Sequence, residues 1–224
     1  MTIAAGFVAS DGLLLFADTQ FTGYSKSYAD KIIPENFGDS IVVFAFAGDG
    51  DYAKTAIADS FEAIAAIRER RTVWNIRKSL RRKISKVIQD YNRNCADPVN
   101  RPEFLIAIGT DDGSMAMFST RETAIPPVDR YECRGSGGSI ANPAVRDFFE
   151  SAQSIPLSDL IPCAVYALSV AKRHDAYSGG VSQFAVLRGM QYYPIVPSHE
   201  RTIQTGTCLN MTCIAACFFY AWPI

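Results

Sequence analysis

The order of strand-like and helix-like segments constrains the fold of this chain more than any other feature. Residues 3–9 and 12–18 are apolar on either side of the turn sequence SDG, and EFLIAIGT and SMAMFS flank DDG in the same way. Apolar runs joined by such turns indicate antiparallel hairpins. Helical patterns follow in pairs, near 51–70, up to about 93, and over 140–152 and 157–173. Grouped elements of this kind predict an α+β fold, a four-layer αββα sandwich with two stacked antiparallel sheets flanked by helices.

The remaining segments fit the same plan. The apolar run IVVFAFA over 41–47 predicts a buried strand, and Gly48 and Gly50 follow it directly before a helix. A glycine-containing turn between a strand and a helix presents backbone N–H groups to a ligand. Shorter strands are expected near 130–134, 182–188 and 191–196, a turn at GSGG, and a polar loop through 19–30.

Composition limits the class of protein. The chain has 224 residues, 48% of them hydrophobic, and a net charge of -1, which favours a single globular domain over residues 1–204. No basic, apolar leader is visible, so we expect a cytoplasmic protein. Six scattered cysteines without CxxC spacing and only two histidines predict reduced thiols, no metal site and no organic cofactor.

Two segments suggest partners but have simpler explanations. The apolar tail over 205–224 is shorter than the roughly 20 residues of a membrane span and lacks flanking basic residues, so we expect no membrane anchor. The basic stretch RERRTVWNIRKSLRRKISK carries apolar residues at helical spacing. It is therefore interpreted as an amphipathic helix with a solvated basic face rather than a nucleic-acid site.

The usual catalytic motifs are missing from the sequence. There is no G-x-S-x-G, no H-E-x-x-H and no Walker loop. A chain poor in histidine can still perform nucleophilic catalysis if its own α-amine, with a reference pKa of about 7.7–8.0, is the base. Thr2 would supply the hydroxyl after removal of Met1, Asp18 and Lys31 a carboxylate and a lysine, and the Gly48 N–H an oxyanion donor.

Five blocks in order resemble a known family. TIAAGFVASDGLLLFADTQ, DKI, FAFAGDGD, RGSGG and RHDAYSGGVSQFAVL are similar to the signature blocks of catalytic β-type proteasome subunits and bacterial proteasome homologues. DAYSGG is the most specific of them. The resemblance implies an N-terminal-nucleophile threonine peptidase, with subunits assembled into rings around a closed proteolytic chamber. It also implies a polypeptide substrate and, because a closed chamber excludes folded proteins, an ATP-dependent unfoldase as a possible partner.

The resemblance assigns roles to individual residues. Thr2 matches the nucleophile, Asp18 and Lys31 its charged partners, and Gly48 the oxyanion donor. The supporting polar network and the substrate contacts are matched by Ser136, Asp175, Ser178, Thr22 and Phe46. Thr22 would pair with an extended substrate, and a phenylalanine at position 46 would shorten the pocket before the scissile bond, favouring small or medium side chains.

Several alternatives stay open at this point. The segment from Asp18 to Lys31 is short for the family and Gln20 replaces the usual arginine, so Lys26 is a second candidate for the site lysine. Asp18 could instead cap a turn, and Lys31 could be a solvated loop charge. A hydrolase of small amides with the same fold, or a non-catalytic subunit that only shapes an assembly, would also fit the sequence.

Overall fold

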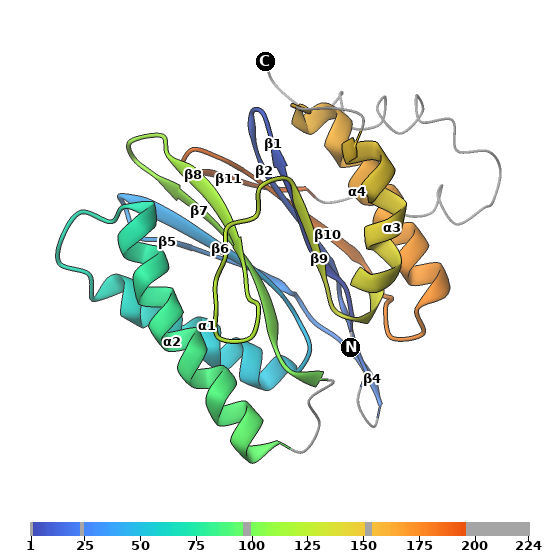
Figure 1. Cartoon of the computed structure of the whole chain (residues 1–224), viewed down its shortest axis with the longest axis horizontal. Helices are drawn as coiled ribbons and strands as arrows, with labels where there is room; N and C mark the ends of the chain where they lie inside the picture. Colours follow the sequence, from blue (N-terminus) through green and yellow to red (C-terminus); the bar gives the residue numbers. More distant parts are fainter. Residues whose placement is uncertain (1, 23–24, 96–99, 151–153, 196–224) are drawn as a thin grey trace.

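The computed structural model describes residues 2–22, 25–95, 100–150 and 154–195, and within them four helices and three antiparallel sheets (Figure 1). The larger sheet has the strand order β11-β10-β2-β1-β9. Its strands are β1 (Ala4–Ala9), β2 (Gly12–Asp18), β9 (Tyr131–Arg134), β10 (Ser182–Arg188) and β11 (Gln191–Ile195). β1 and β2 form the first predicted hairpin, which is confirmed, with Ala4 opposite Ala17 and Ala9 opposite Gly12.

The second sheet has the strand order β5-β6-β7-β8. Its strands are β5 (Ile32–Asn36), β6 (Ser40–Ala47), β7 (Glu103–Thr110) and β8 (Met115–Ser119). β7 and β8 form the other predicted hairpin, also confirmed. β6 is buried along its whole length, as its continuous apolar sequence predicts.

The helices pack on the sheets in two pairs. They are α1 (Gly50–Ala65), α2 (Val73–Asn94), α3 (Ser136–Glu150) and α4 (Leu157–His174). Phe7 and Phe16 of the larger sheet share a buried cluster with Leu168 of α4, while Phe44 of β6 shares another with Leu80 of α2. A third cluster lies between the sheets and includes Leu15, Val43 and Leu105. The prediction of an α+β fold with antiparallel sheets and covering helices is confirmed at this level.

α2 carries the basic stretch, and its amphipathic character is confirmed. Ile76, Leu80, Ile84, Ile88 and Tyr91 are buried on one side, whereas Lys78, Arg81, Arg82 and Lys86 are exposed. Burial of the apolar side by the sheet holds this helix in place and leaves the charges in water.

Some local predictions were wrong. The predicted loop over 19–30 contains a small hairpin of β3 (Gln20–Thr22) and β4 (Lys26–Tyr28). β5 was not predicted, because Pro34 and Glu35 interrupt the apolar pattern of a strand. Of the predicted turn at GSGG, Gly135 lies before α3, whereas Ser136, Gly137 and Gly138 form the first turn of that helix. Its glycines permit close packing, since a Cβ at Gly137 would lie 2.5 Å from the Ser178 Oγ.

The ends of the chain are described only in part. The predicted apolar tail over 205–224 lies outside the described residues, as does the last part of the predicted domain, 196–204. Among the helices that the structure does describe, none combines the length and apolar character that crossing a bilayer demands.

Candidate active site

The ends of several strands bring Thr2, Asp18 and Lys31 together. Thr2 lies just before β1, and Asp18 is the last residue of β2. The hairpin register places Ile3 beside Asp18, whose N–H donates to the Ile3 carbonyl at 3.3 Å. Lys31 immediately precedes β5 in the other sheet, and its carbonyl accepts from the Phe46 N–H at 3.3 Å. The site therefore forms where the two sheets meet.

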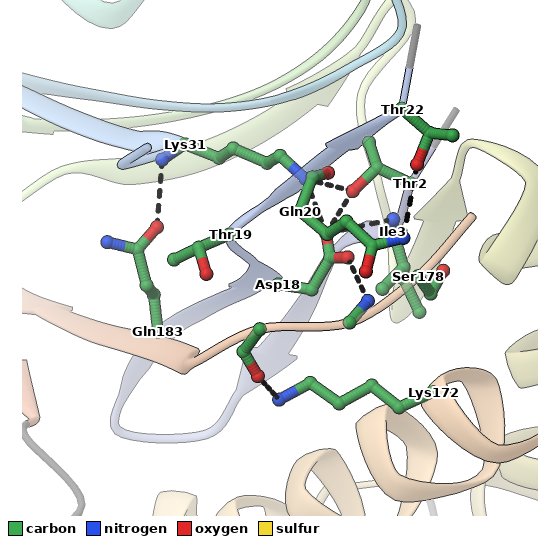
Figure 2. Close-up of polar contacts among 12 residues, drawn as sticks. Thr2, Ile3, Asp18, Thr19, Gln20, Thr22, Lys31, Lys172, Ser178 and Gln183 are labelled. Carbon is green, nitrogen blue, oxygen red and sulfur yellow. Dashed lines mark hydrogen bonds and ion pairs between the residues drawn. The ribbon is translucent and has the colours of Figure 1, made fainter. Parts of the chain in front are cut away.

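The three side chains contact one another directly (Figure 2). The Thr2 hydroxyl donates to the Asp18 Oδ1, and the Lys31 Nζ donates to the Thr2 Oγ1. The Lys31 Nζ lies 2.6 Å from the Asp18 Oδ1. Thr2 is 1% exposed, and Asp18 and Lys31 are fully buried. A hydroxyl, an ammonium and a carboxylate in mutual contact away from water form an arrangement suited to activating the hydroxyl.

Lys31 is a buried lysine with a full set of acceptors. Its ammonium donates to the Thr2 Oγ1, the Asp18 Oδ1 and the Gln20 carbonyl, which matches the three hydrogens that an ammonium carries. Burial lowers the Lys31 pKa from 10.5 to about 8, although Asp18 raises it, and Lys172 adds a smaller lowering. The Phe21 ring lies 4.6 Å from the Nζ. Lys31 is thus still mostly charged at neutral pH but loses its proton easily.

The other candidate lysine lies elsewhere. Lys26 is exposed on β4 and pairs across the small hairpin with Thr22. The structure therefore brings Lys31, and not Lys26, to Thr2. Sequence spacing alone left the two open because the β3–β4 hairpin that turns Lys26 outward was not recognised.

Asp18 is held by donors on both oxygens. Its Oδ1 accepts from the Ile3 N–H at 3.3 Å as well as from Thr2 and Lys31. Its Oδ2 accepts from the Gly179 N–H at 2.7 Å. A carboxylate only accepts hydrogen bonds, so these contacts fix its plane and with it the positions of Thr2 and Lys31.

Ser136, Asp175 and Ser178 form a second polar group. The Asp175 Oδ2 accepts from the Ser136 Oγ at 2.6 Å and from the Ser178 Oγ at 2.6 Å, and the Oδ1 accepts from the Tyr177 N–H at 3.1 Å. This group adjoins the first through backbone contacts. The Gly137 N–H donates to the Thr2 carbonyl at 3.3 Å, and Ser178 precedes the Gly179 that binds Asp18. The three predicted residues thus form one group, which adjoins Thr2 and Asp18 through the backbone of Gly137 and Gly179.

Gly48 lies just beyond β6 in a conformation that favours glycine. Its φ is +92°, and a Cβ there would lie 2.3 Å from the Arg101 carbonyl oxygen. The next residue, Asp49, caps α1 by accepting from the Asp51 and Tyr52 N–H groups. The predicted strand-to-helix turn is present.

The two predicted substrate contacts differ in burial. Phe46 is fully buried, with its ring 5.9 Å from that of Phe21. Thr22 is half-buried at the end of β3, where its Oγ1 accepts from the Gln20 Nε2 at 3.1 Å. The two residues are linked through Phe21, which sequence reasoning did not single out.

Gly135 is a site residue that sequence reasoning did not identify. Its φ is +82°, and a Cβ would lie 1.9 Å from the Thr2 carbonyl oxygen and 3.0 Å from the Ala47 Cβ. Its N–H donates to the Glu103 carboxylate at 2.9 Å. Gly135 thereby packs the backbone of Thr2 against the end of β6. The RGSGG block was a signal for it, but the sequence analysis took only Ser136 from that block as a site residue.

The described residues around Thr2 do not form a metal-binding cluster. Among the described residues, no group of three or more His, Cys, Asp or Glu side chains is placed to hold a metal ion. A hollow of about 370 Å³ is lined by residues that include Arg101, Glu103 and Arg134, and Thr2, Asp18 and Lys31 are not among its lining residues. The buried contacts around Thr2 therefore define the candidate site better than this hollow does.

Comparison with known proteins gives a fold but no family. No protein-family model matches the chain, and no curated protein sequence does. Solved structures do match. Anbu (ancestral beta-subunit) from Yersinia bercovieri aligns at 13% identity over 98% of this chain and 94% of that chain, with a TM-score of 0.74. The helical assembly of the Anbu complex from Pseudomonas aeruginosa aligns at 13% over 98% and 93%, with a TM-score of 0.71. Anbu from Hyphomicrobium sp. strain MC1 aligns at 11% over 98% and 94%, with a TM-score of 0.70.

These matches correct the resemblance stated from the sequence. The chain is similar in fold to Anbu proteins, which have a proteasome-like fold but form a different family, so the assignment to β-type proteasome subunits was wrong. The motif blocks were misleading because each is short and carries one or more of the candidate site residues, from Thr2 in the first block to Ser178 in the last. Residues that build one kind of site on a shared fold do not separate the families that use it.

Proposed function

We propose that this protein is an N-terminal-nucleophile hydrolase, specifically a threonine endopeptidase with Thr2 as its nucleophile. The observation that carries the proposal is the buried contact of the Thr2 hydroxyl with Asp18 and Lys31. The proposal includes the four-layer αββα arrangement of sheets and helices. Similarity in fold to Anbu supports that arrangement.

The proposed reaction is acyl transfer through Thr2. The Oγ1 attacks the peptide carbonyl carbon while its proton passes to the α-amine of Thr2, and the Lys31 ammonium stabilises the charge that develops on the oxygen. The Gly48 N–H donates to the carbonyl oxygen as it becomes an oxyanion. The C–N bond then breaks, the α-amine returns the proton to the leaving amine, and an ester on Thr2 remains. Water attacks the ester, releases the acid and restores the hydroxyl.

The mechanism requires a free α-amine on Thr2. Met1 lies outside the described residues, so its removal is part of the proposal. The small side chain of Thr2 permits the removal of Met1. The Lys31 charge lowers the pKa of a neighbouring amine by like-charge repulsion, which leaves more of the amine neutral at pH 7.

The proposed substrate is an extended polypeptide. Thr22 would pair with its backbone, in the manner of strand addition. Phe46 would limit the pocket before the scissile bond, so peptides with small or medium residues there should be cleaved faster than those with aromatic or basic residues. Faster cleavage of the bulky peptides would contradict this part of the proposal.

We also propose that the chain self-associates. The Pseudomonas aeruginosa Anbu structure is of a helical assembly, and repeated head-to-tail contacts give rings when they close and helices when they do not. A closed assembly would suit proteolysis and would call for an ATP-dependent unfoldase, whereas a monomer or dimer would suit a small-amide hydrolase. Light scattering after gel filtration separates these cases.

Hydrolysis of fluorogenic peptides by the wild-type protein and two variants tests the function. The wild-type protein should cleave them, Thr2→Ala should lose activity by about 1000-fold or more, and Lys86→Met, on the exposed face of α2, should be unchanged. Intact mass spectrometry should give a chain that begins at Thr2. Equal activity in Thr2→Ala, or a retained Met1 in an active protein, would refute the proposal. Inactivity of all three, with assembly intact, would favour a non-catalytic subunit.

A further inference from the structure

Lys172 links a helix to the loop that holds Asp18. It lies in the last turn of α4, and its Nζ donates to the Gly180 carbonyl at 2.7 Å and to the Ser182 Oγ at 2.7 Å. Ser182 is the first residue of β10 and is paired with Asp18 in the sheet. One side chain therefore ties α4 to both the loop and the strand next to the site.

The loop over 175–181 contains two adjacent glycines and is held from the β2–β3 side by backbone contacts: the Gly179 carbonyl accepts from the Gln20 N–H at 3.2 Å, and the Val181 N–H donates to the Thr19 Oγ1 at 2.9 Å. Gly180 has a φ of +72°, and glycine gives the backbone little stiffness of its own. Asp175 anchors the start of the loop through Ser136 and Ser178. Lys172 adds an anchor from the α4 side at its end, on the Gly180 carbonyl. Between the two anchors, the Gly179 N–H reaches the Asp18 Oδ2 at 2.7 Å.

We propose that Lys172 is a positioning residue for the candidate site, because its ammonium group clamps the 175–181 loop and so keeps the Gly179 N–H on Asp18. The proposal rests on the proposed function only for its effect on catalysis; the clamp itself is independent of activity. The Asp18 carboxylate in turn orients the Thr2 hydroxyl and the Lys31 ammonium. A shift of this loop would therefore change the position of the Thr2 hydroxyl, although Lys172 would not contact a substrate.

The charge of Lys172 also affects the site, because it changes the pKa of Lys31. Asp18 on β2 raises the Lys31 pKa, and Lys172 on α4 lowers it. On α1, the Lys54 ammonium lies 5.8 Å from the centre of the Phe21 ring that Lys31 also contacts. Removing the Lys172 charge should therefore raise the Lys31 pKa, an effect that a purely structural residue would not have.

Two variants and a matched control test the proposal by nuclear magnetic resonance. Lys172→Met keeps the aliphatic stem but removes the charge and the donors, whereas Lys172→Arg keeps both. Arg173→Met removes a charge from the next, exposed residue of the same helix. In Lys172→Met the Gly179 amide should exchange with solvent about tenfold faster, and the Lys31 titration midpoint should move to higher pH. Lys172→Arg should retain most of the protection, and Arg173→Met should match the wild-type protein.

The outcomes separate this proposal from the proposed function. Unchanged Gly179 exchange and an unchanged Lys31 midpoint in Lys172→Met would overturn it, as would equal losses in Lys172→Met and Lys172→Arg. If Lys172→Met does not fold, Ser182→Ala removes one partner of the clamp and should give a smaller change in the same direction. Amide exchange at Gly179 and the titration of Lys31 can be measured whether or not the protein is a peptidase. In an active enzyme, Lys172→Met should also lower kcat about tenfold and move the basic limb of the pH profile upward.

Discussion

The buried Lys31 makes a quantitative prediction about stability at alkaline pH. Its pKa falls from 10.5 to about 8 on folding because burial disfavours the charge. At about 1.4 kcal/mol per pH unit, carrying that charge in the folded state costs about 3 kcal/mol. Between pH 8 and 10.5 the unfolded chain holds a proton on Lys31 that the folded chain has lost. Stability from this group therefore rises with pH across that window and is constant below it.

Comparison with Lys31→Met isolates the effect. Both proteins share every other titrating group, so the difference between their free energies of unfolding should change by about 3 kcal/mol between pH 8 and 10.5, in favour of the wild-type protein. Urea unfolding at a series of pH values measures it. Lys86→Met, which removes an exposed lysine, should track the wild-type protein throughout. If the difference in free energy of unfolding between the wild-type protein and Lys31→Met does not change with pH, Lys31 has an ordinary pKa and is not buried against Thr2 and Asp18.

Three further predictions concern the neighbouring residues. Gly135→Ala should cost about 3 kcal/mol or more in urea unfolding, because its Cβ would meet the Thr2 carbonyl. Gly113→Ala, at the same φ of +82° but in open space, should cost only about 1–2 kcal/mol; equal losses would contradict the packing argument. Asp175→Ala should destabilise by about 2 kcal/mol, since two hydroxyl donors lose their acceptor, and a loss below about 0.5 kcal/mol would show that the group is not formed. Peptide hydrolysis should fall as pH rises through about 8, where Lys31 loses its proton, and a plateau to pH 10 would mean that its charge is not needed.

The sequence was sufficient where pattern and periodicity are strong. The hairpins around SDG and DDG and the apolar side of α2 could be predicted because burial of one face imposes a regular spacing. Thr2, Asp18 and Lys31 could be grouped as candidates because their side chains are the types that an N-terminal nucleophile requires and because they lie in the motif blocks.

The remaining features depend on contacts that spacing does not encode. The choice between Lys31 and Lys26 required the small polar hairpin of β3 and β4, whose residues carry no strong strand signal. Lys172 reaches its partners from a helix end, where a basic residue is ordinarily explained by the helix dipole. Gly135 lies in one of the motif blocks, but its role in packing the Thr2 backbone against β6 depends on the close approach of Thr2 and Ala47.

Covalent trapping tests most directly whether Thr2 is an N-terminal nucleophile. The wild-type protein would be incubated with a peptide that carries an electrophile at its carboxyl end, then digested and analysed by mass spectrometry. We expect one adduct, located on a terminal fragment that begins at Thr2, and none in Thr2→Ala. An adduct elsewhere in the chain, or an unmodified Thr2 in a protein that hydrolyses peptides, would contradict it.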